Sequence, residues 1–413
     1  MRLAVISPFL DKNHGTERAV SELIERLARD YGCEIHVYSQ RVEDVFLTPL
    51  DEMSQAARGW IRWHRVVSVP GPHLIQYLWW FVANTFQRWW DVRFRKLSPD
   101  LIFSPGINAC DADVIQVPIV FEEFYRRVKP QLLFRRAPPA SWPRLFHRRV
   151  YYGLVRRLES RIYRRTQVHL AGISGMVVAQ LDAHFGRRDA VSIPYGVDVN
   201  CFEPKARLQR RSGARADLNL VPQTFALLLI GNDWRNKGLL TLIEALNECR
   251  NLPIQLLVVG KDDARPFEAA MRKLRLLNRI TFLAPSKDVM KFYAAADAYA
   301  GPSLQDAYGL PVIEAMASGL PVIASINAGA SEIINHGANG LLLRDPTNAV
   351  ELAGLIRRLV NDPSLRELLA GNAVNTARQC TLDHNAAAMW ELLNKARARN
   401  CAPAKLKERT WLH

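Results

Sequence analysis

The chain has 413 residues, of which 49% are apolar, so it is long enough for two domains with separate cores. Its formal net charge of +15 favours an anionic partner, such as a phosphate-bearing substrate, an acidic lipid or a nucleic acid, and charge alone does not choose among them. The six cysteines lie far apart without metal-ligand spacing, which is typical of a protein from a reducing compartment.

The N-terminal segment predicts a βαβ unit. Residues 2–7 read as a buried strand, a loop runs from Pro8 to Gly15, an amphipathic helix follows, and Glu34 to Tyr38 reads as a second strand. Because α/β sheets bind ligands at the carboxyl ends of their strands, we expect Gly15 to lie beside a ligand-binding cleft.

No targeting or spanning segment is evident. The short apolar run at the N-terminus is interrupted at residues 11–13 before a secretory signal is complete. No apolar stretch approaches the roughly twenty residues of a membrane-spanning helix. We therefore expect a cytoplasmic protein whose contact with a membrane, at the inner face of the cytoplasmic membrane, is peripheral.

Residues 74–96 combine aromatic and basic side chains, and residues 121–165 are rich in arginine. Tryptophan with arginine suits the headgroup zone of an anionic membrane, but a buried aromatic core beneath a solvated basic face fits the same composition. Interleaved arginine and aromatic residues also suit single-stranded nucleic acid, yet no known nucleic-acid-binding motif is present, and we expect no nucleic-acid partner. The residues concerned are Trp79, Trp80, Phe81, Phe86, Trp89, Trp90, Phe94, Arg88, Arg93, Arg95, Lys96, Arg126, Arg127, Arg135, Arg136, Arg148, Arg149, Arg156 and Arg157.

Further short apolar runs separated by helical stretches predict two parallel α/β domains. The first domain is predicted over residues 1–197, and a polar, arginine-rich segment over 198–224 reads as a linker. The second domain is predicted over 225–382. Residues 383–413 read as a helix and tail that packs back on the first domain.

The most informative stretch is residues 301–324. It predicts a loop, a helix that starts with Pro311 in its first turn and ends at Gly319, and a strand. The backbone N–H groups from Gly309 to Val312 then face a ligand, and a helix N-terminus with unpaired donors favours a phosphate. Asp306 precedes this turn, and Glu314 lies one turn into the helix.

A second stretch, residues 229–246, predicts a strand, a polar loop with two cations and an amphipathic helix. Arg235 can bind phosphate oxygens in a bidentate manner and Lys237 adds a point charge, so together they suit a departing diphosphate. The ordinary alternative for two basic loop residues is a solvated surface.

Together these stretches resemble the signature of family 4 glycosyltransferases, whose two acidic residues stand eight positions apart. The resemblance implies an α/β chain of the GT-B fold, with two Rossmann-like domains that face each other across a cleft. It implies that Glu314 binds the nucleotide ribose and Asp306 the donor sugar, with Asp306, Arg235 and Lys237 as the catalytic residues. The residues that it assigns to donor binding are Gly15, Gly231, Arg235, Lys237, Gly309, Leu310, Pro311 and Glu314.

The chain departs from the family at two positions, with Asp306 where Glu is usual and Pro118 where relatives often have His. His14, beside Gly15, is a weaker candidate for the phosphate loop. The bare Asp111-x-Asp113 pattern is one that metal-dependent transferases use, but the helix start and the two cations already supply positive charge. We therefore expect no metal and no cofactor, since the nucleotide-sugar is a substrate.

The resemblance implies a retaining hexosyltransferase that moves a sugar from a UDP- or GDP-sugar, and we expect a lipid-linked, polysaccharide or cell-envelope acceptor, as in lipopolysaccharide biosynthesis. Two alternatives stay open. One is a sugar-phosphate or sucrose-type synthase of the same fold, and the other is a non-catalytic protein that binds a membrane or a nucleic acid.

Overall fold

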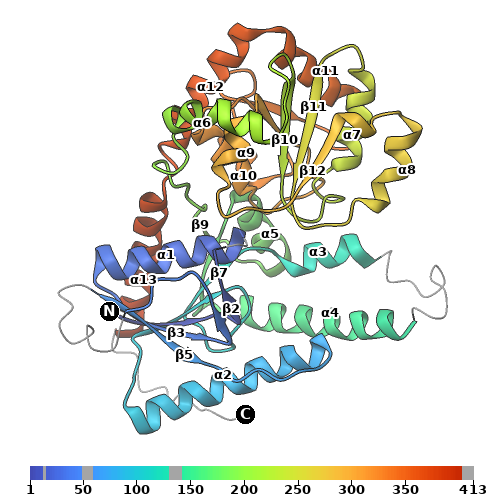
Figure 1. The fold of residues 1–413 in the computed structure, drawn as a ribbon. Helices are drawn as coiled ribbons and strands as arrows, with labels where there is room; N and C mark the ends of the chain where they lie inside the picture. The colour runs from blue at the N-terminus through green and yellow to red at the C-terminus, as the bar shows by residue number, and fades with distance from the viewer. Residues whose placement is uncertain (13–14, 49–58, 130–141, 402–413) are drawn as a thin grey trace. The chain divides into compact units, whose positions relative to one another are not determined.

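The computed structural model describes residues 1–12, 15–48, 59–129 and 142–401. The chain divides into two compact units (Figure 1). The first contains residues 1–193 and the C-terminal residues from Asn385 onward, and the second contains Pro194–His384. Both units are parallel α/β structures, so the two Rossmann-like domains predicted from the sequence are confirmed.

The first unit is built on a seven-stranded parallel sheet of order β5-β3-β1-β6-β7-β8-β9. Its strands are β1 (Arg2–Ile6), β3 (Glu34–Ser39), β5 (Trp60–Arg65), β6 (Leu101–Pro105), β7 (Val114–Val117), β8 (His169–Gly172) and β9 (Val191–Ser192). A small ladder joins β2 (Phe9–Leu10) to β4 (Arg41–Val42). Its helices are α1 (Gly15–Tyr31), α2 (His73–Arg95), α3 (Phe121–Val128), α4 (Trp142–Tyr163), α5 (Gly175–Phe185) and α13 (Leu382–Cys401).

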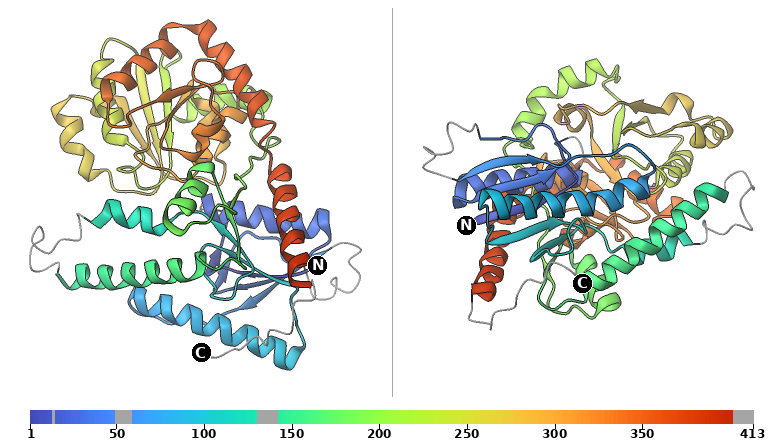
Figure 2. Two further views of the ribbon diagram at one scale, coloured as in Figure 1. Left: turned by 180° about the vertical axis from the view of Figure 1, so that it is seen from behind. Right: turned by 90° about the horizontal axis from the view of Figure 1, so that it is seen from below.

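The first sheet is covered on both faces, as parallel sheets require. Helix α1 buries the apolar face predicted from its 3.6-residue period, including Val20, Leu23, Ile24 and Leu27. Helix α13 contributes Met389 and Leu393 to the same core, so the C-terminal helix belongs to the first unit. Helix α2 lies on the opposite side of the sheet (Figures 1 and 2).

The second unit is built on a six-stranded parallel sheet of order β12-β11-β10-β13-β14-β15. Its strands are β10 (Phe225–Ile230), β11 (Ile254–Val259), β12 (Ile280–Leu283), β13 (Ala298–Gly301), β14 (Val322–Ser325) and β15 (Leu341–Leu343). Its helices are α6 (Pro204–Asp217), α7 (Leu239–Glu248), α8 (Arg265–Lys273), α9 (Met290–Ala295), α10 (Leu310–Ala317), α11 (Ala349–Asn361) and α12 (Pro363–Ala377). The central strand β10 is apolar along its whole length, and Gln255 is the single polar residue of its neighbour β11, as expected for strands that helices cover on both faces.

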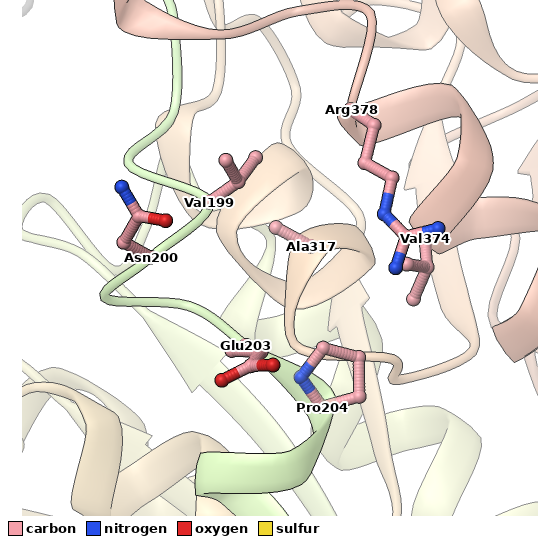
Figure 3. A pocket seen from close by; sticks show the side chains of 7 residues that line it. All are labelled: Val199, Asn200, Glu203, Pro204, Ala317, Val374 and Arg378. Atoms are coloured by element: carbon pink, nitrogen blue, oxygen red, sulfur yellow. The ribbon is translucent and has the colours of Figure 1, made fainter.

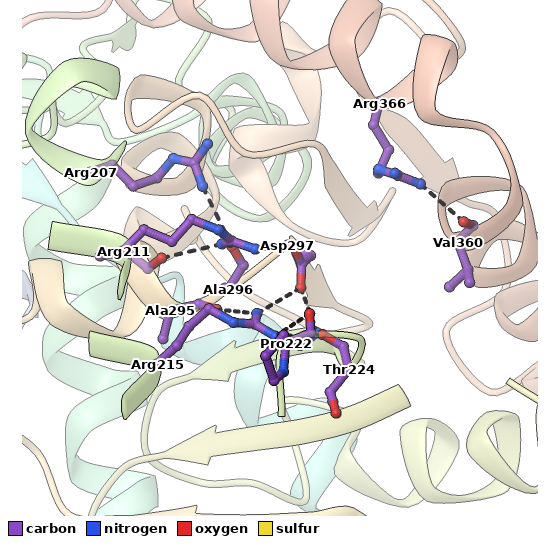
Figure 4. A network of polar contacts seen from close by, with 12 residues as sticks. Arg207, Arg211, Arg215, Pro222, Thr224, Ala295, Ala296, Asp297, Val360 and Arg366 are labelled. Atoms are coloured by element: carbon purple, nitrogen blue, oxygen red, sulfur yellow. Dashed lines mark hydrogen bonds and ion pairs between the residues drawn. The ribbon is translucent and has the colours of Figure 1, made fainter. Parts of the chain in front are cut away.

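The segment 198–224, which the sequence suggests is a linker, contains helix α6 and belongs to the second unit. Arg207, Arg211 and Arg215 of α6 bind neighbouring groups of the protein (Figure 4), whereas Arg210 is exposed. Arg211 and Arg215 form ion pairs of 2.5 and 3.1 Å with Asp297, which also accepts a 2.8 Å hydrogen bond from the N–H of Ala226 in β10. The polar composition therefore reflects an ion-pair network that holds α6 against the sheet, and the boundary between the units lies at residue 194.

Among the described residues, the helices are either too short or too polar to cross a bilayer.

Candidate functional site

The second unit has the loop, helix and strand predicted for residues 301–324. Helix α10 begins at Leu310 with Pro311 in its first turn, and Gly319 follows its end with φ +69°. Gly309 caps the helix with φ +95°, a conformation that residues with a Cβ adopt only with strain. A glycine is therefore required at the point where the chain turns into the helix.

The start of α10 offers fewer free donors than the sequence suggests. The N–H of Val312 donates to the Gly309 carbonyl over 2.9 Å, so it is not available to a ligand. Within the described part of the chain, the N–H groups of Gly309 and Leu310 have no hydrogen-bond acceptor. These two groups, with the positive end of the helix dipole, are what the helix presents to an anion.

Asp306 and Lys237 meet in the structure although they are 69 positions apart. The Lys237 Nζ lies 2.5 Å from the Asp306 Oδ2, and the two side chains are 17% and 18% exposed. The backbone of Asp306 is fixed by its N–H, which donates to the Asn327 carbonyl, and by its carbonyl, which accepts from the Gly329 N–H. The two stretches selected from the sequence therefore form one site, with the ion pair at its centre.

The loop after β10 is shaped around the Lys237 side chain. Gly231 has φ +142°, and a Cβ on it would lie 2.8 Å from the Lys237 Cε. Asn236 ties this loop to the segment before α10, because its carbonyl accepts from the Leu304 N–H and its side-chain amide donates to the Gln305 carbonyl, each over 2.7 Å. Sequence reasoning did not select Asn236. Its partners lie in a different loop, and their proximity appears only in the fold.

Arg235, in the same loop, is exposed, and no partner of its guanidinium is found within the described residues. It therefore differs from Lys237, which is held in place before any ligand arrives. An exposed arginine on a loop can swing towards a phosphate, and its planar group suits bidentate contact.

Glu314 is buried in α10, with 3% of the residue exposed. The Tyr293 Oη, from α9, donates a 2.6 Å hydrogen bond to the Glu314 Oε2. Such a bond to a charged acceptor stabilises the carboxylate and fixes its orientation. Tyr293 is a second residue that sequence reasoning missed, because nothing in the sequence links α9 to α10.

The nearby phenol of Tyr299, on β13, is neutral. Burial, with the charges of Asp306 and Glu314, raises its pKa far above the ordinary value. A deprotonated tyrosine is therefore excluded as a base at this site near neutral pH.

The remaining candidates lie in the first unit. Gly15 is the exposed first residue of α1, and His14 lies outside the described residues. The Asp111 carboxylate accepts two hydrogen bonds from Arg88, of 2.7 and 2.9 Å. Asp113 accepts from the Ile102 N–H and from the Asn400 side chain. Both carboxylates of the Asp-x-Asp pattern thus bind neighbouring groups of the protein. Elsewhere in the described ranges, no cluster of three His, Cys, Asp or Glu residues suits a metal ion.

A pocket of about 210 Å³ lies at the other end of α10, beside Ala317 (Figure 3). None of the residues predicted for the donor site lines it. The lining residues are Val199, Asn200, Glu203, Pro204, Ala317, Val374 and Arg378. The pocket therefore lies at the carbonyl end of α10 and is separate from the residues predicted for the donor site.

Residues 211–376 match the family model "Glycosyl transferases group 1". The chain is 30% identical over 215 residues to a D-inositol 3-phosphate glycosyltransferase of Jonesia denitrificans, which covers 49% of this chain and 50% of that protein. It is 32% identical over 168 residues to the lipopolysaccharide glucosyltransferase WaaG of Escherichia coli, which covers 40% of this chain and 43% of that protein. The chain thus spans about half the length of the curated relatives it matches.

Solved structures share the fold. The structure of WaaG has a TM-score of 0.73 at 20% identity, covering 94% of this chain and 99% of that chain. Sucrose-phosphate synthase from Thermosynechococcus elongatus has a TM-score of 0.74 at 21% identity, covering 97% and 100%. Anabaena HepE in complex with UDP-glucose has a TM-score of 0.68 at 20% identity, covering 96% and 100%. These likenesses confirm the fold class, and the family match confirms the glycosyltransferase resemblance at the level of group 1.

Proposed function

We propose that this chain, whose residues 211–376 match the group 1 glycosyltransferase model, transfers a hexose from a UDP- or GDP-sugar with retention of anomeric configuration. The observation that carries the proposal is the Lys237–Asp306 ion pair beside the start of α10. It brings a cation, a carboxylate and a helix N-terminus together at one point of the second unit.

The positive groups suit a nucleoside diphosphate. Lys237, Arg235 and the N–H groups of Gly309 and Leu310 provide charge and donors for the oxygens of a leaving diphosphate. Charge that develops on a leaving group is stabilised most by donors already in place, and Lys237 is held before the donor binds. We therefore assign leaving-group stabilisation to Lys237 first and to Arg235 second.

The two carboxylates suit hydroxyl groups. Glu314, oriented by Tyr293, accepts hydrogen bonds from the ribose, and Asp306 accepts from the donor sugar. A carboxylate that accepts from a sugar hydroxyl makes a charge-assisted hydrogen bond and fixes the sugar for reaction. Asp306 then contacts the sugar while Lys237 contacts the phosphate, so the ion pair bridges the two halves of the donor.

The site offers no convincing general base. In the proposed mechanism, the bond between the anomeric carbon and the diphosphate oxygen breaks, and the acceptor hydroxyl oxygen forms its bond to the anomeric carbon on the same face, which gives retention. The departing diphosphate oxygen accepts the proton of that hydroxyl. Because cations and a helix dipole supply the positive charge, we expect no divalent metal to be required.

For the acceptor we propose a glycan or lipid-linked molecule of the cell envelope, as in lipopolysaccharide assembly, modified by a cytoplasmic enzyme at the inner membrane face. The relative WaaG is named as a lipopolysaccharide glucosyltransferase. The net charge of +15 fits an anionic membrane surface, and we propose no nucleic-acid partner.

A turnover screen tests the proposal. The purified chain is incubated with UDP-, GDP- and ADP-sugars, with and without EDTA, and release of the nucleotide is measured. We expect one donor to give slow release through hydrolysis, at a rate that EDTA does not change. No release from any donor, with or without added cell-envelope lipid, would contradict transferase function, and loss of release in EDTA would contradict the metal-independent mechanism.

A further inference from the structure

Helix α2 has the reverse of the usual polarity of a surface helix, because most of its buried side chains are polar and many of its exposed side chains are apolar. Its buried positions are Trp80, Asn84, Arg88 and Asp91, at spacings of four, four and three residues. A surface helix normally turns apolar residues inward and polar residues outward. Three of the four buried side chains of α2 are polar or charged, so its inward face is polar.

The polar face of α2 is fixed to strands β3 and β5 and to the turn between β6 and β7. Arg88 binds Asp111 through both terminal nitrogens, and Asp91 accepts a 3.0 Å hydrogen bond from the Tyr38 Oη. The His64 Nδ1 also lies 3.0 Å from the Asp91 carboxylate. Breaking such buried polar contacts costs several kcal/mol, so the helix is not free to turn its other face inward.

The outward face of α2 carries a row of exposed apolar side chains, which Arg93 joins near the C-terminal end of the helix. Eight large apolar side chains on this face are exposed, and they are separated by one, three or four residues, the spacings that place side chains along one stripe of a helix. The stripe covers 19 residue steps, or about 28 Å at 1.5 Å per residue. We define the outward stripe as Ile75, Leu78, Trp79, Val82, Phe86, Trp89, Trp90 and Phe94, whose exposed fractions range from 37% to 63%.

The charges around the outward stripe are positive. Arg93 and Lys96 are exposed at its C-terminal end, and the single carboxylate of α2, Asp91, is buried. Tryptophan rings and cations are the groups that favour the boundary between lipid headgroups and acyl chains. A second copy of this chain carries the same net charge of +15, and this like charge opposes association through the stripe. An acidic lipid surface has the opposite charge and attracts the chain.

We propose that the outward stripe of α2 docks on an anionic lipid surface, with the helix lying in the plane of the interface. Trp79, Trp89 and Trp90 enter the headgroup zone, and Arg93 and Lys96 contact lipid phosphates. The inference rests on the proposed function, since it names the surface by which the enzyme reaches a membrane-bound acceptor. Figure 1 shows α2 on the outer side of β3 and β5, and Figure 2 shows the same placement from two further directions.

Co-sedimentation of the full chain with vesicles tests the proposal, without any sugar donor. Vesicles of phosphatidylcholine alone are compared with vesicles that also contain phosphatidylglycerol, and we expect stronger binding to the anionic vesicles. The apolar variant is Val82→Ser with Phe86→Ser and Trp89→Ser, and its control is Val350→Ser with Leu368→Ser, two exposed residues of the second unit. We expect the apolar variant to bind at least about tenfold more weakly, because binding scales with the apolar area inserted.

The charge variant is Arg93→Ser with Lys96→Ser, and its control is Arg188→Ser with Arg272→Ser, whose side chains are 88% and 69% exposed. We expect about fivefold weaker binding to anionic vesicles for each cation removed from the stripe, and a smaller loss in the control. Donor-induced thermal stabilisation, measured on every variant, shows that the site in the second unit is intact.

Two results would overturn the proposal. One is equal vesicle binding by wild type and both stripe variants. The other is a dimer in light scattering that the apolar variant abolishes, which would assign the stripe to a second copy of the chain. Because vesicle binding is measured without a donor, a protein that binds vesicles but releases no nucleotide would contradict the proposed function and leave the docking face standing.

Discussion

At the scale of single residues, the ion pair between Lys237 and Asp306 organises the candidate site. Each side chain is less than one-fifth exposed, so a charge left alone there is poorly solvated. The two groups therefore hold each other in place, where the proposed mechanism needs a cation at the diphosphate and a carboxylate at the sugar. Gly231 leaves room for the Lys237 stem, and a larger residue there would displace the ammonium group.

Replacing Lys237 by alanine tests its role at the diphosphate. We expect kcat/KM for donor turnover to fall by about 10²–10³, the usual effect of losing one preorganised group that stabilises developing charge. The matched control is Lys273→Ala, an exposed lysine in the last turn of α8. Turnover within twofold of wild type in Lys237→Ala would show that the lysine only balances the charge of Asp306.

Sequence reasoning selected Asp306, Lys237 and Glu314 because each lies in a short motif beside a helix start, where local chemistry decides the role. It missed Asn236 and Tyr293, which act through contacts made by folding. The carbonyl of Asn236 accepts from Leu304, 68 positions away, and Tyr293 comes from another helix. Such partners depend on how loops and helices meet, and no local pattern encodes them.

At the scale of elements, a buried polar cluster joins β3, β5 and α2. The His36 Nδ1 lies 2.8 Å from the His64 Nε2, and both His64 and Tyr38 contact Asp91. The strand register creates the cluster by placing Tyr38 opposite His64. The sequence did not reveal it, since a one-residue shift in register would turn these side chains to the other face of the sheet.

This cluster predicts a pH dependence of stability. Burial lowers the pKa of His36 to about 3 and that of His64 to about 4, so both are neutral in the folded chain. In the unfolded chain they take up protons below about pH 6.5. The unfolded state therefore binds more protons between pH 6.5 and 4, and acidification through this window destabilises the fold.

Urea unfolding at pH 7, 5.5 and 4.5 measures the effect. The comparison is with a variant that has His36→Gln and His64→Gln. As the pH falls, the free energy of unfolding of the wild type should decrease relative to this variant by up to about 2.7 kcal/mol per pH unit, because each of the two histidines contributes up to about 1.36 kcal/mol. A control with His336→Gln and His384→Gln, in the second unit, should keep the wild-type slope. A constant difference between wild type and the cluster variant at all three pH values would contradict the assignment of neutral histidines.

Helix α2 and helix α6 show where composition misleads at this scale. The aromatic and basic composition of residues 74–96 fits both a membrane face and a buried aromatic core. The structure turns most of the apolar side chains of α2 outward, because Arg88 binds Asp111 and Asp91 binds Tyr38 beneath the helix. The arginines of α6 suggested a linker because an ion-pair network with Asp297 is not visible in composition.

At the scale of the whole molecule, two parallel α/β units follow from the sequence because their central strands are continuous apolar runs separated by helical periods. The boundary at residue 194 and the membership of α13 in the first unit depend on packing, through Met389 and Leu393. The residues proposed to bind the donor, apart from Gly15, lie in the second unit. The proposed nucleotide site therefore belongs to the second unit and the proposed lipid-docking face to the first unit.

Calorimetric titration of the full chain with UDP and GDP tests the central claim most directly. We predict that one of the two nucleotides binds with a stoichiometry near one, and that Glu314→Gln weakens its binding by at least about tenfold, because a hydrogen bond to a charged acceptor is lost. The control Glu367→Gln, an exposed residue of α12, should bind as the wild type does. No binding of either nucleotide, or equal affinity in wild type and Glu314→Gln, would contradict the assignment of the nucleotide site to the start of α10.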